Sequence, residues 1–343
     1  MKALVLKEYN HFVMKDVPEP AIAPEKVLVQ VKACGICGSD VHGMDGSTGR
    51  RQPPMIMGHE AAGIVVDAGS CVSEWKKGDR VTFDSTIYCG ACWHCRRGEI
   101  NLCDNRRVLG VSCAEYRQAG AFAELIAVPA RILYRLPDSL PFEEAAMVEA
   151  LSVAVHAAGR APLSLGDASL VVGAGMIGLL EMQVLKARGC ALVASADVAS
   201  ERLELARKLG ADVTIDTRTA DAAAEMRKLT AGRGADVVIE AVGIASTIRI
   251  AIESVRKGGC VTLVGNLSQS VDFPLQIAVT REISVFGSCA SRGEYPACLD
   301  LMARGAIDVR SLISAVAPLA EGPSWFKRLY DREPGLMKVI LTP

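Results

Sequence analysis

Strand-like and helix-like segments alternate between residues 169 and 287, and this alternation constrains the fold more than any other feature. Six short apolar runs rich in β-branched residues begin near residues 169, 191, 213, 235, 259 and 282, and helical segments follow most of them. Parallel strands require this order, because each strand must return through a crossover connection, which is usually a helix. The segment is therefore predicted to form an α/β domain with a doubly wound parallel sheet.

The rest of the chain has a different pattern. Up to about residue 150, short extended segments are broken by glycine and proline, which predicts a mainly antiparallel β domain. A helix is predicted behind Pro141, another over residues 295–304, and a last strand in MKVILTP. A chain of 343 residues usually forms two domains. We expect one domain from residues 1–150 and 288–343, with a returning tail, and a second from residues 151–287.

A glycine-rich turn joins the first strand of the α/β segment to its helix. In Gly173, Gly175 and Gly178, the first glycine permits the turn, the second admits a pyrophosphate and the third lets the helix pack closely. Asp197 ends the next strand, where a carboxylate accepts hydrogen bonds from an adenosine ribose and repels a 2′-phosphate. The turn predicts a dinucleotide site that prefers NAD to NADP. A helix-capping aspartate is the alternative, and Arg202 lies either beside the adenosine or in solvent.

Four cysteines gather within 15 residues of the β domain: Cys89, Cys92, Cys95 and Cys103. Four thiolates on tight loops form a closed tetrahedral zinc site, which is structural because no coordination position stays open. A ferredoxin-type iron–sulfur cluster is the alternative, but its last gap is three residues with a proline following, whereas the gap here is seven. We predict a structural zinc lobe over about residues 85–108.

A second group of metal-ligand residue types is spread along the same domain. Cys37 follows a strand, His59 and Glu60 come some twenty residues later, and Glu149 lies in a helical segment. Cysteine, histidine and a carboxylate form open zinc sites, in which water or substrate takes the remaining position. The alternatives are a buried core cysteine, a surface acid on the helix, and a redox pair of Cys37 with Cys34.

Composition excludes several other functions. Lys+Arg 38 against Asp+Glu 39 gives a net charge of -1, which is too little to hold a nucleic-acid backbone. The longest apolar stretch, residues 170–180, is far shorter than the roughly 20 residues of a membrane span. No signal peptide is evident, so clustered cysteines indicate metal ligands rather than disulfides. We expect a soluble, cytoplasmic protein with no nucleic-acid or membrane partner.

Several motifs occur in one order over essentially the whole chain: GICGSDVH (35–42), GHEAAG (58–63), the four-cysteine lobe, VEALSVAVHA (148–157) and VVGAGMIGLL (171–180). With them the sequence resembles the zinc-containing medium-chain dehydrogenase/reductase family, most closely its branch of polyol dehydrogenases such as sorbitol and galactitol-phosphate dehydrogenases. The resemblance implies a GroES-like catalytic domain and a Rossmann domain. It also implies one catalytic and one structural Zn²⁺, NAD as cofactor, and a homodimer or homotetramer.

The resemblance assigns the metal ligands residue by residue. It implies that Cys37 and His59 bind the catalytic zinc and that Glu60 and Glu149 are its carboxylate ligand or near-ligand, with Glu149 favoured as the standing ligand. Asp40 matches the acid that orients the zinc-bound imidazole.

The implied reaction is oxidation of a secondary alcohol of a polyol or polyol derivative to a ketone, with hydride transfer to NAD. The metal lowers the pKa of the substrate hydroxyl. Ser39 and His42 match relay positions that pass the released proton through the cofactor ribose to solvent. For His42, a structural loop histidine beside a water chain is the alternative.

The resemblance also places the loops after the later strands, including Gly287 and Cys289, beside the nicotinamide. Packing within ordinary core strands explains Val242 and Val264 equally well. The full set of predicted cofactor residues is Gly173, Ala174, Gly175, Met176, Ile177, Gly178, Asp197, Arg202, Val242, Gly243, Val264, Gly265, Asn266 and Ser288.

The sequence departs from sorbitol dehydrogenases where substrate selectivity is set. Gly43 stands where they have a tyrosine, Ala290 stands where they have a substrate-binding arginine, and the loop over residues 112–120 is longer. Arg117 or Arg292 reaching an acidic group would suit a sugar phosphate or an aldonate, whereas a solvated loop is the alternative for residues 115–117.

Other functions remain open at this stage. L-threonine, a butanediol or an aldonate are alternative substrates within the same family. A zinc-free quinone reductase is disfavoured by the complete ligand set, and a catalytically silent NAD- or zinc-binding protein is the alternative outside enzymes.

Overall fold

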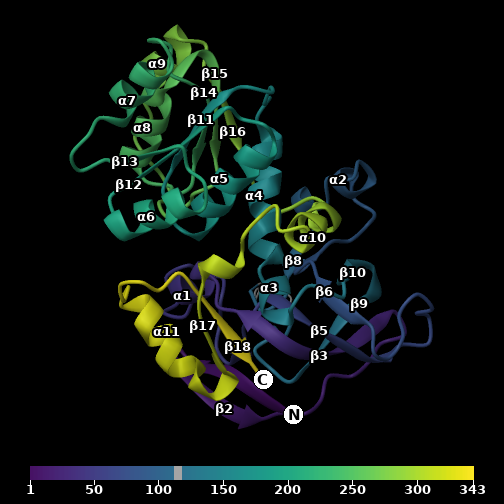
Figure 1. Cartoon of the computed structure of the whole chain (residues 1–343). Coiled ribbons are helices and arrows are strands. Elements are labelled where there is room, and N and C mark those ends of the chain that lie inside the picture. The colour runs from purple at the N-terminus through teal and green to yellow at the C-terminus, as the bar shows by residue number, and fades with distance from the viewer. Residues whose placement is uncertain (112–117) are drawn as a thin grey trace. The chain divides into compact units, whose positions relative to one another are not determined.

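The computed structural model describes residues 1–111 and 118–343 and divides the chain into two compact units (Figure 1). Unit 1 comprises Met1–Glu149, Tyr295–Arg304 and Val309–Pro343. Unit 2 comprises Ala150–Glu294 and Gly305–Asp308. The chain therefore returns to unit 1 at Tyr295, seven residues after the boundary expected at residue 288, and visits unit 2 once more before its end.

Unit 2 is built around one parallel sheet with the strand order β13-β12-β11-β14-β15-β16. Its strands are β11 (Ala168–Val172), β12 (Leu192–Asp197), β13 (Val213–Asp216), β14 (Ala235–Glu240), β15 (Val255–Leu263) and β16 (Ser284–Gly287). All six predicted strands are present, in the order of a doubly wound fold. The order reverses between β11 and β14, and ligands of open α/β sheets bind at such a switch point.

Helices connect these strands, as the alternation predicts: α5 (Met176–Ala187), α6 (Ser200–Lys208), α7 (Ala222–Leu229), α8 (Ala245–Ser254) and α9 (Leu275–Thr280). Helix α7 packs on α8, which also contacts α9. The Asp221 side chain caps α7 by accepting hydrogen bonds from the backbone N–H groups of Ala223 (2.8 Å) and Ala224 (3.1 Å).

Two boundaries differ from the sequence-based expectation. The strand β15 begins at Val255, not near residue 259, because Val255 is fully buried and pairs with Ala235 of β14. Behind Pro141 the expected single helix is two helices, α3 (Phe142–Ala145) and α4 (Val148–Arg160). Both differences concern residues whose apolar spacing fits either conformation, so burial and pairing decide between them.

Unit 1 is mainly β. Its strands are β1 (Lys2–Glu8), β2 (His11–Asp16), β3 (Lys26–Gly35), β4 (Met55–Ile56), β5 (Glu60–Ala68), β6 (Arg80–Phe83), β7 (Thr86–Ile87), β8 (Arg107–Val108), β9 (Leu125–Pro129), β10 (Leu133–Arg135), β17 (Ile313–Pro318) and β18 (Lys338–Thr342). The largest sheet has the order β10-β6-β5-β3-β18-β17, and β9 also pairs with β3. A second sheet has the order β2-β1-β4, and β7 pairs with β8.

The remaining helices of unit 1 are α1 (Gly38–Gly43), α2 (Trp93–Arg96), α10 (Tyr295–Ala303) and α11 (Gly322–Tyr330). Phe326 of α11 stacks on Phe12 at 4.3 Å between ring centroids and meets Phe122 edge-on at 5.7 Å, which joins the tail to the β core. The strand β18 pairs with β3, so the tail returns to the first part of the chain as expected. Among the residues that the structure describes, no helix is both long and apolar enough to span a bilayer.

Candidate active site

The ends of two paired strands bring the predicted metal ligands together. In the antiparallel pair of β3 and β5, Gly35 lies opposite Glu60. Cys37 follows β3 by two residues and His59 directly precedes β5, so both lie at this end of the sheet. Gly35 leaves room for the Glu60 carboxylate, because a Cβ at residue 35 would lie 2.4 Å from Oε2 of Glu60 and would displace it. The sheet register thus positions residues that are more than twenty positions apart.

Cys37 is the residue before the first turn of α1, with extended backbone angles (φ -83°, ψ 147°). Its carbonyl accepts the N–H of Asp40 at 2.9 Å, and its own N–H donates to Oδ2 of Asp40 at 3.4 Å. This reciprocal capping directs the Asp40 carboxylate back toward the strand ends. On the other strand, Gly58 has φ +96°, a conformation that favours glycine, and it sets the direction in which His59 leaves the loop.

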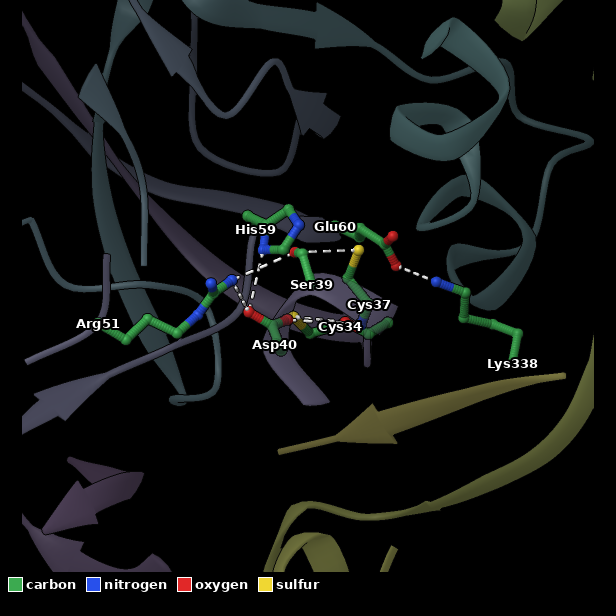
Figure 2. A network of polar contacts seen from close by, with 9 residues as sticks. Cys34, Cys37, Ser39, Asp40, Arg51, His59, Glu60 and Lys338 are labelled. Atoms are coloured by element: carbon green, nitrogen blue, oxygen red, sulfur yellow. Dashed lines mark hydrogen bonds and ion pairs between the residues drawn. The ribbon is translucent and has the colours of Figure 1, made fainter. Parts of the chain in front are cut away.

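The ligand atoms of Cys37, His59 and Glu60 all lie within 4.8 Å of one another (Figure 2). One thiolate, one imidazole and one carboxylate form a donor set that zinc accepts. Burial alone would lower the pKa of His59, but the Asp40 carboxylate and Cys37 raise it well above its usual value. The surroundings of the imidazole are therefore electronegative and favour a positive charge.

The imidazole of His59 also has the neighbour that a metal ligand needs. Its Nδ1 is buried and makes no hydrogen bond, although Oδ1 of Asp40 lies only 3.4 Å away. A ring that binds an ion through Nε2 donates Nδ1–H to such a carboxylate, which satisfies the buried atom. The residues present therefore fit a zinc ion held by Cys37 and His59.

Glu149 lies apart from this group. It stands in the first turn of α4, and no ligand atom of Glu149 joins the three that lie within 4.8 Å. Burial raises the pKa of Glu149 to about 7. The neighbouring His59 lowers this pKa, whereas the carboxylates of Glu60 and Asp84 raise it further. It is thus near enough to interact electrostatically with the group, while Glu60 is the carboxylate that the structure brings to Cys37 and His59.

Two buried cations flank the group, and the sequence pattern indicated neither. Arg51 donates from Nη2 to Oδ1 of Asp40 at 2.7 Å, with both side chains almost inaccessible to solvent. Burial alone would raise the pKa of Asp40, but His59 and Arg51 lower it to about 2. Lys338 of β18 donates from Nζ to Oε2 of Glu60 at 2.5 Å, and this pair is equally buried. A lysine inside the apolar run MKVILTP was the available signal for this second cation.

The two predicted relay residues occupy α1. Ser39 donates its hydroxyl to Sγ of Cys37 at 3.3 Å, so its Oγ lies beside a ligand atom. His42 is exposed in the last turn of α1, and its carbonyl accepts a hydrogen bond from the hydroxyl of Ser47 at 2.9 Å.

The four cysteines of the lobe also come together. The sulfurs of Cys89, Cys92, Cys95 and Cys103 lie within 4.8 Å of one another. Cys89 Sγ accepts the backbone N–H groups of Cys92 (3.4 Å) and Ala91 (3.5 Å), and these donors lower the pKa of Cys89 to about 6. Backbone donors aimed at a sulfur stabilise a thiolate, so this group fits a second, closed zinc site.

In unit 2 the glycine turn has the geometry that a pyrophosphate requires. Gly173 has φ +100°, and a Cβ on Gly178 would lie 1.7 Å from the carbonyl oxygen of Gly173. A Cβ on Gly175 would meet no atom within 4 Å, so the start of α5 is open on that side. Open space at the N-terminus of a helix, where backbone N–H groups have no partner, fits an anion.

Asp197 and Arg202 lie beside this turn. The Asp197 carboxylate accepts the N–H groups of Ala174 at 2.6 Å and Ala199 at 2.9 Å, so the acid holds the turn itself. Arg202 Nη1 lies 3.9 Å from the same carboxylate and is about half exposed.

The loops that follow β14 and β15 pack backbone against backbone. A Cβ on Gly243 would lie 2.3 Å from the nitrogen of Asn266, and one on Gly265 would lie 2.2 Å from the carbonyl carbon of Val242. Glu240, which the sequence analysis did not single out, is fully buried and accepts the N–H groups of Val242 (3.0 Å) and Gly243 (2.8 Å). Val264 donates its N–H to the carbonyl of Glu240 at 2.9 Å. Ser288 donates its N–H to the carbonyl of Leu263 at 3.0 Å.

The predicted substrate contacts are only partly visible. Residues 115–117, with Glu115, Tyr116 and Arg117, lie outside the described residues. Arg292 is exposed in unit 2, and its N–H donates to the Glu294 carboxylate.

A Cys–His–carboxylate group in a β unit and a dinucleotide turn in an α/β unit define the class of metal-dependent dehydrogenases. Residues 23–138 match the alcohol dehydrogenase GroES-like domain, and residues 177–304 match the zinc-binding dehydrogenase domain. The chain belongs to the zinc-binding alcohol dehydrogenase family and is an oxidoreductase with a GroES-like and a Rossmann-type part.

Named relatives cover most or all of the chain. Sorbitol dehydrogenase of Bacillus subtilis is 34% identical over 100% of this chain and 97% of its own length. L-idonate 5-dehydrogenase of Vitis vinifera is 37% identical over 86% of this chain and 81% of its own length.

Solved structures agree with this family. A zinc-binding dehydrogenase from Sinorhizobium meliloti 1021, bound to NADP, is 32% identical with a TM-score of 0.91 over 100% of this chain and 99% of that chain. An alcohol dehydrogenase from Escherichia coli CFT073, complexed with NADH, is 29% identical with a TM-score of 0.91 over 100% and 99%.

Proposed function

We propose that this protein oxidises a secondary alcohol of a polyol or polyol derivative to a ketone and transfers the hydride to NAD. The observation that carries the proposal is the group of Cys37, His59 and Glu60, whose ligand atoms lie within 4.8 Å of one another. A zinc ion held there supplies a Lewis acid that lowers the pKa of the substrate hydroxyl. The polyol class is supported by the names of relatives, which include sorbitol and L-idonate dehydrogenases.

The chain's own residues have the following roles in this proposal. Cys37 and His59 hold the ion, and Glu60 or Glu149 supplies the carboxylate ligand. Ser39, whose hydroxyl already lies 3.3 Å from Sγ of Cys37, accepts the proton that the alcohol releases. His42 passes the proton on to solvent, because it is exposed at the end of the same helix and an imidazole can both accept and donate a proton.

NAD is the proposed cofactor. Asp197 ends β12 with a buried carboxylate, and a negative charge at this position repels a 2′-phosphate. Arg202 is the opposing influence, because its guanidinium lies 3.9 Å from Asp197 and an arginine near this place accommodates a 2′-phosphate. We give the carboxylate more weight because it is fixed by two backbone N–H groups, whereas Arg202 is about half exposed.

A homodimer is the proposed assembly, with a cytoplasmic location as expected from the sequence. Within the part of the chain that the structure describes, β16 is the last strand of its sheet, so one edge of its backbone is unpaired. Val285 of this strand is 37% exposed, and further large apolar side chains are exposed between β15 and β16: Leu267, Phe273, Leu275 and Val279. An open apolar edge favours pairing with the same edge of a second copy.

A metal count combined with an NAD-reduction assay tests the function. The purified protein is expected to contain two zinc ions per chain and to reduce NAD with at least one member of a panel of polyols, sugar phosphates, aldonates and amino alcohols. Cys37→Ser is expected to retain one zinc, and its kcat is expected to fall by at least about 100-fold. A Cys37→Ser variant that holds a single zinc and is as active as the wild type would contradict the proposal. A protein that binds zinc and NAD but oxidises no alcohol would favour a catalytically silent binding protein.

A further inference from the structure

Arg51 is the largest side chain among those that the structure shows as fully buried, at 1% exposure. It directly follows exposed residues, including Arg50. Removing a guanidinium from water costs several kcal/mol, and replacing a whole buried ion pair such as Arg51 with Asp40 by apolar side chains of similar volume is often neutral or stabilising. Stability alone therefore does not explain an arginine at position 51.

Within the described residues, a single nitrogen makes both side-chain hydrogen bonds of the guanidinium. Nη2 donates to Oδ1 of Asp40 at 2.7 Å and to Oγ of Ser39 at 3.2 Å. An Nη group has two hydrogens, so these two bonds use both of them. The position of Nη2 is thereby fixed relative to two different side chains of α1.

Each of these acceptors contacts a ligand residue of the candidate metal site. Asp40 Oδ1 lies 3.4 Å from Nδ1 of His59, and Asp40 Oδ2 accepts the N–H of Cys37 at 3.4 Å. Ser39 Oγ lies 3.3 Å from Sγ of Cys37. Figure 2 shows Arg51 approaching this network from one side, while Lys338 approaches Glu60 from the other. Arg51 thus holds both groups that orient the ligands, although it contacts neither ligand itself.

Gly43 provides the space that Arg51 occupies. A Cβ on Gly43 would lie 2.5 Å from Cδ of Arg51 and 2.6 Å from its Nη1. Gly43 is the last residue of α1, where alanine suits the backbone better than glycine does. The position of the Arg51 side chain therefore depends on the absence of a side chain at residue 43.

We propose that Arg51 is a positioning residue of the catalytic centre, which fixes the Asp40 carboxylate against His59 and the Ser39 hydroxyl against Cys37 in the space that Gly43 leaves open. The inference rests on the proposed function, because it assumes that Cys37 and His59 hold a catalytic ion. It assigns one arginine to two tasks: orienting the metal-binding imidazole and holding the hydroxyl that receives the substrate proton.

The test compares Arg51→Met with Arg50→Met, a matched loss of one arginine at the exposed neighbouring position. For Arg51→Met we expect zinc affinity of the Cys37 site, measured by competition with a chelator, to fall by about 10–100-fold, as for other partners of metal-binding side chains. The lobe is expected to retain its zinc, kcat to fall by about the same factor, and the Kd of NAD to stay unchanged. Arg50→Met is expected to behave as wild type.

Two further variants separate positioning from a general loss of structure. Gly43→Ala keeps every charged group but displaces Arg51, so it is expected to reproduce the losses of Arg51→Met. Arg51→Lys, which keeps one charge and a donor, is expected to restore part of the zinc affinity. If Arg51→Met does not fold, Gly43→Ala decides alone: unchanged zinc affinity and kcat would overturn the proposal.

The outcomes distinguish this inference from the proposed function. A wild-type protein that binds no zinc at the Cys37 site or oxidises no alcohol contradicts the proposed function itself. A wild-type protein that does both, with Arg51→Met and Gly43→Ala equal to it in zinc affinity and kcat, contradicts only the role of Arg51.

Discussion

At the scale of single residues, the Cys37–His59 group lies between two buried ion pairs. Asp40 with Arg51 and Glu60 with Lys338 are each less than 5% exposed. A buried charge is tolerated only with a partner of opposite sign, so each pair fixes the position of its carboxylate. The Asp40 carboxylate lies 3.4 Å from Nδ1 of His59, and the Glu60 carboxylate lies within 4.8 Å of Sγ of Cys37, so the buried charges are part of the geometry of the candidate site.

Lys338→Met tests the second of these pairs. Without zinc, the variant leaves the Glu60 carboxylate buried and unpaired, so we expect the free energy of unfolding to fall by about 3–5 kcal/mol. With zinc bound beside Glu60, the ion supplies positive charge, so the loss should be clearly smaller. Thermal unfolding with and without zinc measures both values, with Lys338→Met/Glu60→Gln as the control that removes the whole pair. An equal loss in both states would show that Glu60 does not face the ion.

Ser39→Ala tests the proton path. The hydroxyl of Ser39 lies 3.3 Å from Sγ of Cys37, so its removal should slow proton transfer from the substrate. We expect kcat for alcohol oxidation to fall by about 10²–10⁴-fold, the usual contribution of such a group. The Kd of NAD should remain unchanged, because the predicted cofactor turn is elsewhere in the chain. Near-normal turnover across about pH 6–9 would mean that another group or a water chain carries the proton.

Residue spacing was sufficient to predict that the four lobe cysteines come together, whereas the grouping of Cys37 with His59 was predicted from the family resemblance. Spacing was not sufficient for Arg51 and Lys338. Lys338 is 278 positions from Glu60, and only the sheet that includes β18 brings them together. A buried cation is defined by a partner distant in sequence, and hydrophobic periodicity carries no information about that partner.

At the scale of helices and strands, periodicity predicted all six strands of the parallel sheet, because buried parallel strands are continuous apolar runs. It failed at the start of β15 and at the break between α3 and α4, where the residue types suit either conformation. Glu149 as the standing ligand, which the family resemblance favours, stays a prediction, and the structure brings the Glu60 carboxylate within 4.8 Å of the ligand atoms of Cys37 and His59. The reason is the ladder, in which Glu60 lies directly opposite Gly35.

Helix α5 contains a buried carboxyl group that leads to a stability prediction. Glu181 is fully buried, and among the described residues neither of its carboxyl oxygens has a hydrogen-bond partner. Burial raises the pKa of Glu181 well above its ordinary value of 4.5. The folded protein therefore holds this proton more tightly than the unfolded chain, and stability is lost as the pH rises above 4.5 toward the folded-state pKa.

Glu181→Gln removes this dependence. We expect the variant to be more stable than wild type at pH 7, because the neutral amide has no proton to lose as the pH rises above the ordinary pKa of a glutamate. The difference should shrink toward pH 5, where the unfolded glutamate also begins to take up its proton. Unfolding midpoints measured at several pH values give the comparison, and a difference that does not change with pH would refute a neutral buried Glu181.

At the scale of the whole molecule, the family architecture follows from the order of the elements, while the assembly depends on the surface. We expect the protein to sediment as a dimer or larger species. Val285→Lys places a charge on the open edge strand β16, where Val285 is 37% exposed, and should yield monomers. Unchanged sedimentation of Val285→Lys would exclude this edge as the interface, and a monomeric wild-type protein would exclude the homodimer.

The central claim is that hydride leaves the secondary carbon of an alcohol held at the Cys37–His59 centre and is received by NAD. The most direct measurement is mass spectrometry of the NADH formed from a polyol carrying deuterium at the carbon that is oxidised. The account predicts one deuterium per NADH with the zinc-loaded protein and almost no NADH with Cys37→Ser. Unlabelled NADH, or labelled NADH formed equally fast by Cys37→Ser, would contradict it.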